Sequence, residues 1–277
     1  MISRIGFMQG RLSPLIDGKI QSFPWQTWQH EFPAARDLGL GIMEWTLDQE
    51  DLYLNPLLTI SGQQEIRFLC STHQLSIPSL TGDCFMQAPF WKASGQEKSR
   101  LEDDFIAISH ACVEVGIAII VVPLVDNGSL DNKQQHDTFV DFMLTKANLF
   151  SELGIKVIFE SDLPPVPLAN FISLLPSSVF GINYDIGNSA ALGYNPDEEF
   201  SSYGNRIVNV HIKDRPIGGT SVPLGTGNAD FPMVFSLLKH ASYNGNLILQ
   251  TARAKDGDHI AVMRQYIGQI EAWIRES

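Results

Sequence analysis

Four polar side chains that could bind a metal ion stand at the end of a short apolar run of the sequence or within one. Glu160, Asp185 and Gln250 end such runs, and His211 lies in another. A charged carboxylate beside apolar residues is unfavourable unless it is paired with a cation or bound to a metal ion. Two carboxylates, one imidazole and one amide oxygen make a ligand set that suits Mn²⁺, Mg²⁺, Co²⁺ or Zn²⁺. Such an ion would polarise a carbonyl or hydroxyl group of a substrate. The alternative is that each acid caps the next helix or pairs with a lysine such as Lys213.

The elements that must position these residues are short apolar runs that alternate with turns and amphipathic stretches. Several runs are continuously apolar, as expected of parallel strands that are covered on both faces. Helical spacing of apolar residues follows at 97–115, 137–153 and 231–240. The pattern predicts about eight βα units, with strands at 2–7, 42–46, 76–81, 117–124, 155–160, 179–185, 207–212 and 246–251.

Eight consecutive βα units favour a closed (β/α)₈ TIM barrel of the α/β class over an open doubly wound sheet. No Gly/Ser linker or charge run divides the chain, so we expect one domain over residues 1–277. In such a barrel the carboxyl ends of the strands meet at one mouth, where the catalytic groups gather. The strand-end residues expected there are Glu44, Asp83, Glu160, Asp185, His211 and Gln250.

Five short motifs occur in a fixed order along the chain. They are Phe159-Glu160-Ser161, Tyr184-Asp185-Ile186-Gly187-Asn188, Val210-His211-Ile212-Lys213-Asp214, Leu224-Gly225-Thr226-Gly227 and Leu249-Gln250-Thr251. Together they resemble the signatures of xylose isomerase-like TIM-barrel proteins, the sugar isomerase/epimerase superfamily. The resemblance implies that Glu160, Asp185, His211 and residue 250 bind a divalent metal ion. It also implies that two glutamates, at 160 and 250, would move a proton next to a carbonyl.

Two positions depart from that pattern. Gln250 replaces the second glutamate, and although an amide oxygen can bind a cation, it cannot accept or donate a proton as a base does. Asn188 replaces a histidine that contacts substrate oxygens in the family. We therefore expect Glu160 to act alone as the base or acid, in a one-base proton transfer or an elimination.

The resemblance favours a metal-dependent sugar or sugar-phosphate isomerase or epimerase. One alternative is a sugar-binding protein of the same fold that has lost turnover. Another is a metal-dependent phosphoesterase related to apurinic-site endonucleases, which share the barrel but have additional histidine ligands.

Further residues at the predicted mouth are expected to bind the substrate. Arg11, Arg215 and Arg253 follow the first, seventh and eighth predicted strands, where they could hold a carboxylate or phosphate group. The alternative is that these arginines pair with nearby acids. The remaining residues expected to contact the substrate are Glu44, Asn188, Lys213 and Trp91.

The segment 82–95 carries Phe85, Met86, Phe90 and Trp91, although connecting loops are usually short and polar. We expect it to be a lid over a sugar ring or a self-association surface, which would make the protein a homodimer.

The composition excludes several classes of protein. The 19 Lys and Arg residues against 31 Asp and Glu residues leave a net charge of −12, which argues against a broad nucleic-acid-binding face. No stretch of about 18 apolar residues predicts a membrane span. The three cysteines form no Cys-x-x-Cys pair, so neither a disulfide framework nor a thiolate zinc site is indicated. These features together predict a cytoplasmic protein that acts on a small molecule.

Overall fold

The computed structural model describes residues 2–277, and within this range eight parallel strands close into a barrel. β1 pairs with β2 on one side and with β8 on the other, which closes the ring. The strands are β1 (Ile5–Met8), β2 (Ile42–Thr46), β3 (Ser76–Thr81), β4 (Ile119–Leu124), β5 (Lys156–Ser161), β6 (Phe180–Asp185), β7 (Ile207–Ile212) and β8 (Asn246–Leu249). The predicted (β/α)₈ barrel is confirmed.

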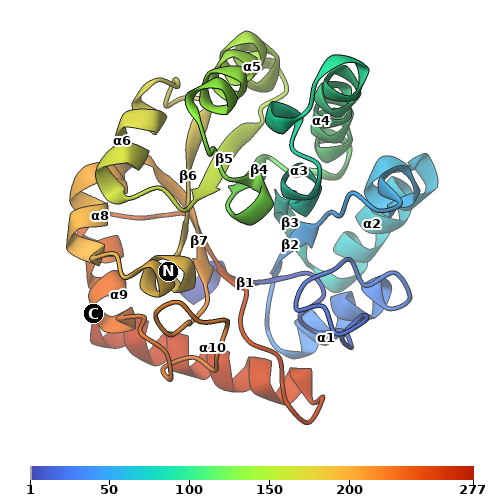
Figure 1. Ribbon diagram of the computed structural model, residues 1–277. Helices are drawn as coiled ribbons and strands as arrows, with labels where there is room; N and C mark the ends of the chain where they lie inside the picture. Colours follow the sequence, from blue (N-terminus) through green and yellow to red (C-terminus); the bar gives the residue numbers. More distant parts are fainter. Residues whose placement is uncertain (1) are drawn as a thin grey trace.

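Helices surround the strands, and the longer ones form an outer ring (Figure 1). They are α1 (Glu31–Asp37), α2 (Ile60–His73), α3 (Asp83–Gln87), α4 (Gly95–Val115), α5 (Lys133–Glu152), α6 (Pro165–Ser173), α7 (Ile186–Leu192), α8 (Pro196–Tyr203), α9 (Phe231–His240) and α10 (His259–Glu276). Short 3₁₀ turns lie at Ile2–Arg4, Trp28–His30, Leu52–Leu54, Pro56–Leu58, Phe90–Lys92, Asp126–Gly128 and Gly204–Arg206. None of the helices in residues 2–277 is both long and apolar enough to cross a membrane.

The core between strands and helices is built from the apolar stripes that the sequence predicts. On α4 the stripe includes the buried Phe105 and Ile108, and on α5 it includes Phe139 and Phe150. The ring of Phe139 lies edge-on to that of Phe159 from β5, with 5.4 Å between their centroids. Burial of these aromatic rings holds α5 against the strand that carries Glu160.

Three predicted strand boundaries are wrong by two or three residues, and the hydrogen bonds explain why. Residues 2–4 form a 3₁₀ turn, so β1 begins at Ile5, where its pairing with β8 begins. β4 begins at Ile119 because the Ile117 amide donates to the Cys112 carbonyl and closes the end of α4. β8 ends at Leu249, so Gln250 is the first residue beyond it, although its amide still donates to the Ile212 carbonyl at 3.0 Å.

The aromatic segment 82–95 packs inward, and the expectation of an exposed lid or self-association surface made by its rings is wrong. Phe85 stacks on Phe105 of α4 with 4.3 Å between centroids. Trp91 is only 3% exposed, lies edge-on to Phe139 and donates its indole N–H to the Gly128 carbonyl at 3.1 Å. The segment forms α3 and the 3₁₀ turn Phe90–Lys92, so its rings complete the core instead of covering a substrate. The homodimer stays a prediction without this surface to support it.

Candidate functional site

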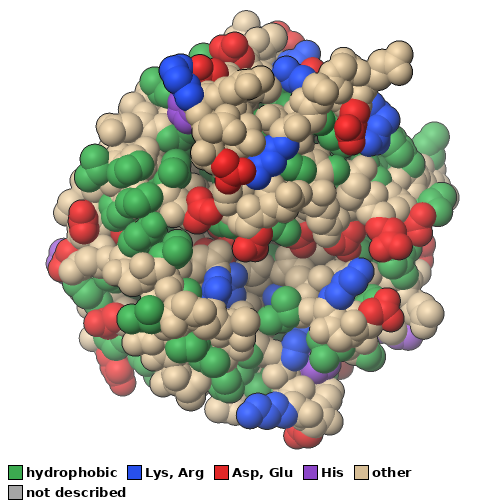
Figure 2. Space-filling model, in the orientation of Figure 1, with side chains coloured by type: hydrophobic (Ala, Val, Ile, Leu, Met, Phe, Trp, Pro, Cys, Tyr) green, Lys and Arg blue, Asp and Glu red, His purple; other side chains and the backbone are tan. Residues whose placement is uncertain are grey.

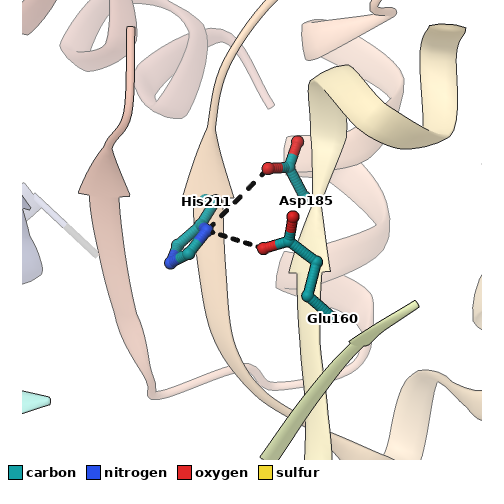
Figure 3. Close-up of side chains that lie close together, drawn as sticks. All are labelled: Glu160, Asp185 and His211. Carbon is teal, nitrogen blue, oxygen red and sulfur yellow. Dashed lines mark ion pairs between the residues drawn. The ribbon is translucent and has the colours of Figure 1, made fainter. Parts of the chain in front are cut away.

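Glu160, Asp185 and His211 come together at the ends of three adjacent strands, β5, β6 and β7. One ligand atom of each lies within 4.8 Å of the others. His211 Nδ1 is 3.0 Å from Glu160 Oε2 and 3.8 Å from Asp185 Oδ2 (Figure 3). Asp185 and His211 are direct partners in the β6–β7 register, so the sheet itself brings their side chains to one point.

Two donor atoms of this cluster, His211 Nδ1 and Asp185 Oδ2, form ion-pair contacts but no well-aligned hydrogen bond. Among the described residues, neither His211 Nδ1 nor Asp185 Oδ2 has a hydrogen-bond partner, although both are buried. Buried polar atoms are nearly always satisfied, so such atoms need an explanation. A divalent ion held by these two atoms and by Glu160 would supply it, and the oxygen and nitrogen donors suit the chemistry of such ions. The residues present therefore fit a divalent metal ion.

Asp185 caps a helix and is also a member of the cluster. The sequence offered helix capping and a place in a polar cluster as alternatives, and this side chain does both. Its Oδ1 accepts the backbone N–H of Asn188 at 2.8 Å, which caps the start of α7. Its Oδ2 faces His211 and forms an ion pair with Lys213, whose Nζ is 2.7 Å away. The helix cap thus holds the carboxylate with one oxygen directed at the cluster.

Two asparagine side chains orient the Glu160 carboxylate. Asn183 Nδ2 donates to Oε2 at 2.9 Å, and Asn188 Nδ2 donates to Oε1 at 2.6 Å. Asn188 Oδ1 in turn accepts from Arg215 Nη1 at 2.7 Å. Because the guanidinium can only donate, this contact fixes which end of the Asn188 amide faces Glu160. Asn188 and Arg215 are both expected to bind substrate. In the structure, Asn188 contacts the Glu160 carboxylate and Arg215 contacts Asn188.

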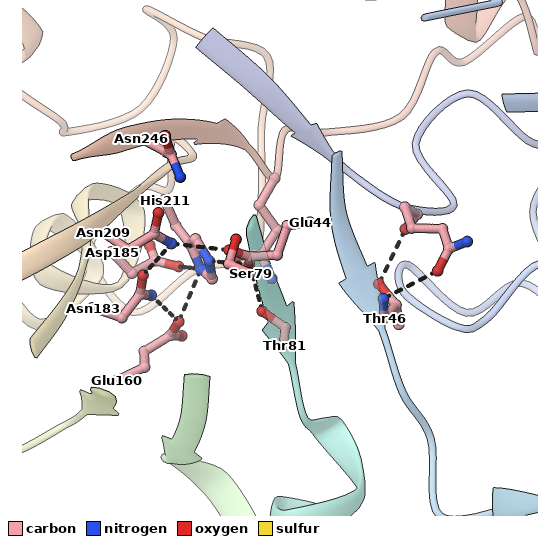
Figure 4. Close-up of polar contacts among 12 residues, drawn as sticks. Glu44, Thr46, Ser79, Thr81, Glu160, Asn183, Asp185, Asn209, His211 and Asn246 are labelled. Carbon is pink, nitrogen blue, oxygen red and sulfur yellow. Dashed lines mark hydrogen bonds and ion pairs between the residues drawn. The ribbon is translucent and has the colours of Figure 1, made fainter. Parts of the chain in front are cut away.

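Glu44 lies inside the barrel rather than at its mouth, so the expectation that it contacts substrate is corrected. It is fully buried, and its carboxylate lies 2.6 Å from His211 Nε2 (Figure 4). The other groups that donate to it at 2.6 to 2.9 Å are Ser79, Thr81 and Asn209. Side chains two residues apart on a strand share a face, which places 79 with 81 and 209 with 211 on the inner surface. That spacing was the signal in the sequence that could have revealed this network.

Glu44 and His211 each stabilise the charged form of the other. Burial by itself raises the pKa of Glu44, but the His211 charge and the hydrogen bonds from His211, Ser79 and Thr81 hold it below its usual value. Burial lowers the pKa of His211, but the Glu44 charge and the contacts with Asp185 and Glu160 raise it well above the usual value. An ionised Glu44 accepts a hydrogen bond from Nε2, which leaves Nδ1 as the nitrogen that faces the cluster.

Gln250 reaches the mouth, but its amide is engaged at both ends. Its Oε1 accepts from Lys213 Nζ at 2.9 Å, and its Nε2 donates to Gln21 Oε1 at 2.7 Å. Gln21 also donates to Asp83 Oδ2 at 2.6 Å. Gln21 lies in the loop between β1 and the 3₁₀ turn that begins at Trp28, where no strand or motif in the sequence signals a role.

Two arginines at the β8 and β1 ends of the mouth donate hydrogen bonds to backbone carbonyl groups. Arg11 donates to the Ile20 carbonyl at 2.8 Å, and Arg253 donates to the Ser13 carbonyl at 2.8 Å. Within residues 2–277, neither guanidinium forms an ion pair with a carboxylate. Burial, together with the Arg253 charge, lowers the pKa of Arg11 to about 9. Figure 2 shows basic side chains beside the hollow near the centre of this face and acidic ones along its opposite edge.

The motif at 224–227 supports the loop after β7. Asp214 Oδ2 accepts the backbone N–H groups of Gly225 and Gly227, both at 2.8 Å. A Cβ at residue 227 would lie 2.2 Å from Asp214 Oδ1, so glycine is required there. This part of the pattern shapes the loop that carries Arg215 and takes no part in the cluster.

Residues 32–276 match the sequence profile of the family described as xylose isomerase-like TIM barrel. The chain belongs to this family. Over 245 residues it is 26% identical to a protein of Haemophilus influenzae named "Putative L-ribulose-5-phosphate 3-epimerase SgbU", and the match covers 81% of this chain and 83% of that protein. It is 24% identical to L-ribulose-5-phosphate 3-epimerase UlaE of Salmonella typhimurium over 240 residues, which are 81% of this chain and 82% of that protein.

Solved structures of the xylose isomerase-like barrel superpose over nearly the whole chain. An L-ribulose 3-epimerase gives a TM-score of 0.75 at 15% identity, with 99% of this chain and 96% of that chain covered. D-psicose 3-epimerase from Clostridium cellulolyticum H10 gives 0.73 at 11% identity, with 98% of each chain covered. At these identities the likeness shows the shared fold.

Proposed function

We propose that this member of the xylose isomerase-like family is a metal-dependent sugar or sugar-phosphate isomerase or epimerase. The observation that carries the proposal is the cluster of Glu160, Asp185 and His211, with two buried donor atoms directed at one point. The match to L-ribulose-5-phosphate 3-epimerases over more than four fifths of the chain supports the same class of reaction.

The ion would be held by Glu160, Asp185 and His211 Nδ1, and it would polarise a carbonyl or hydroxyl oxygen of the sugar. Glu44 has a positioning role, because its contact with Nε2 orients the imidazole. Gln250 is less suited to bind the ion than the family pattern implies, since its amide oxygen already accepts from Lys213.

Glu160 is the catalytic base in this proposal. Its carboxylate takes a proton from the carbon next to the carbonyl, the C–H electron pair moves toward the carbonyl oxygen, and the resulting carboxylic acid returns the proton. Asn183 and Asn188 hold both oxygens during the transfer. A single base returns the proton to the face from which it came, to the same carbon or to its neighbour. Inversion at one carbon, as in an epimerase, needs a second proton donor on the opposite face, and the amide of Gln250 cannot be that donor. The single-base step therefore favours the isomerase of the two proposed activities.

Arg11 and Arg253 define the anionic end of the substrate. Two guanidinium groups held by backbone carbonyls, with no carboxylate partner in the described part of the chain, favour a phosphate or carboxylate group. A sugar phosphate satisfies both halves of the mouth, with its phosphate at the arginines and its carbonyl at the cluster.

The test is exchange of substrate C–H with deuterated water, followed by NMR with Mn²⁺ and a panel of pentose phosphates that includes L-ribulose 5-phosphate. We expect exchange with the parent protein and a loss of about 100- to 10,000-fold in Glu160→Gln. Glu152→Gln, on the exposed face of α5, is the matched control and should exchange as the parent does.

Undiminished exchange in a folded Glu160→Gln protein would refute the assignment of the base. Exchange with none of the sugars would favour the binding protein without turnover, and release of inorganic phosphate would favour the phosphoesterase.

A further inference from the structure

The Lys213 side chain contacts Gln250, the residue at the position where the family pattern has a glutamate ligand. Its Nζ lies 2.7 Å from Asp185 Oδ2 and 2.9 Å from Gln250 Oε1. The residue is only 9% exposed, which is unusual for a lysine. Lys213 is the first residue after β7 and follows His211 by two residues, and both side chains reach Asp185.

The fold holds this ammonium group in place. A Cβ at Gly187 would lie 2.8 Å from Lys213 Cγ and 2.9 Å from its backbone carbonyl atoms, so the start of α7 approaches the lysine as only glycine allows. The stem of Lys213 is therefore packed against the helix that Asp185 caps. Asp185 and Lys213 are thus positioned by the same helix.

The amide of Gln250 is oriented toward Lys213 by a chain of contacts from the opposite side. Arg11 Nη2 lies 3.2 Å from Gln21 Oε1, and because arginine can only donate, this oxygen is the accepting end of Gln21. Gln250 therefore presents its Nε2 to Gln21 and its Oε1 to Lys213. A glutamate at 250 would bring a second negative charge next to Lys213, whereas the glutamine leaves Asp185 as the charged partner of the lysine.

We propose that Lys213 is a built-in cation of this site. Its ammonium group shares Asp185 with the divalent ion and lies beside Gln250, where the family pattern has the fourth ligand. The inference rests on the proposed function for the role of the ion but not for its binding. A positive charge fixed 2.7 Å from a ligand oxygen repels a divalent ion at the same oxygen. The ion is then bound by three protein ligands and is readily exchanged.

The experiment measures Mn²⁺ affinity by isothermal titration calorimetry in the purified full chain. Lys213→Met removes the competing charge, and Gln250→Glu both neutralises it and adds a carboxylate ligand. We expect each variant to bind Mn²⁺ at least about tenfold more tightly than the parent, a change of the size that residues around a metal site produce. The matched control is Lys92→Met, which removes an exposed lysine whose Nζ lies 2.6 Å from Asp131, far from the cluster in the sequence and on the surface.

An unchanged or weaker affinity in a folded Lys213→Met protein would overturn the inference. If that variant does not fold, Gln250→Glu decides alone, and an affinity within twofold of the parent would overturn it. The results also separate this inference from the proposed function. Tighter binding in both variants without proton exchange in the parent supports the built-in cation and refutes the enzyme assignment. Proton exchange in the parent with no change of Mn²⁺ affinity in either variant would support the enzyme assignment and refute the built-in cation.

Discussion

The two sides of the barrel mouth differ in charge and in the groups that contact their polar side chains. On the acidic side, at β5 to β7, the donor atoms of Asp185 and His211 converge and form ion-pair contacts with charged neighbours. On the basic side, at β8 and β1, Arg11, Arg253 and Gln250 are held by carbonyl and amide groups. This difference indicates that the acidic side is suited to bind a cation and the basic side an anion. A substrate that spans the mouth meets a titratable base on one side only.

Lys213 is the point where the two sides meet, since it contacts Asp185 on one and Gln250 on the other. The charge of the acidic side is therefore partly compensated before any ligand binds. Variants that change one side while leaving the other intact can test whether this division has functional meaning.

The largest effect is expected from Asp185→Asn. The asparagine can still cap α7, as Oδ1 does now, but it removes the charge that faces the cluster. We expect Mn²⁺ affinity to fall by about 100-fold or more, because carboxylates are the oxygen donors that such ions prefer. Calorimetry of the folded variant measures this directly.

A control for that variant is Asp230→Asn, which changes the cap of α9 in the same way, since Asp230 Oδ1 accepts the Met233 amide at 3.0 Å. It should bind Mn²⁺ as the parent does. If Asp185→Asn also retained the Mn²⁺ affinity of the parent, Asp185 would act only as a helix cap, and the assignment of the acidic side as a metal site would be refuted.

A smaller loss is expected from Glu44→Gln, because Glu44 lies behind the cluster and contacts His211 without taking part in the proposed ligand set itself. The amide oxygen of glutamine can still accept from Nε2, but the imidazole of His211 loses its charged partner, and we expect Mn²⁺ to bind about 10-fold more weakly. Ser79→Ala removes one hydrogen bond from the same carboxylate but keeps its charge, so its effect should be smaller. Equal affinities for the parent and Glu44→Gln would show that Glu44 only fills the barrel interior.

Glu44 also shows where prediction from the sequence ends. Glu160, Asp185 and His211 could be found because each stands at a strand end, and parallel strands in a closed barrel bring such ends together. The direction of Glu44 depends on the side of β2 that faces the axis, which the pairing of Glu44 with Ser79 determines. No property of the five residues 42–46 by themselves specifies that pairing.

Gln21 and Trp91 escaped correct prediction for different reasons. Gln21 lies in a loop, and its contacts with Asp83 and Gln250 join residues 62 and 229 positions away, which no local pattern can indicate. Trp91 lies in a segment whose apolar content is evident from the sequence, but apolar residues in a connection either cover a ligand or complete the core. The contact with Phe139 from α5 decides for the core, and it depends on tertiary packing.

On the basic side, Arg253→Met should affect the binding of phosphorylated substrates more than the chemical step. We expect KM for a sugar phosphate to rise about tenfold with kcat little changed, because the guanidinium binds substrate and transition state equally. The unphosphorylated sugar should be unaffected. Arg264→Met, on the exposed face of α10, is the matched control. Equal losses for both sugars would place Arg253 in the support of the β1 loop, through its contact with the Ser13 carbonyl.

The smallest effect concerns Asp83, which lies between the two sides. Burial and the nearby charges of Asp48 and Glu160 raise its pKa from 3.8 to about 7, against the opposing effect of Arg11 and the Gln21 hydrogen bond. The folded state therefore holds this proton more tightly than the unfolded state. Its contribution to stability is complete below about pH 4 and is lost as the pH rises toward 7.

Asp83→Asn has no proton to lose there, and its side chain can still accept from Gln21. The free energy of unfolding, measured with urea at pH 5, 6, 7 and 8, should therefore shift in favour of the variant by about 1 kcal/mol per pH unit up to pH 7 and then level off. Asp131→Asn, at an exposed position, should show no such trend. Parallel curves for the parent and Asp83→Asn would mean that Asp83 is ionised in the fold. The mouth would then carry one more negative charge between its two sides, and the contrast between them would be weaker than the contacts indicate.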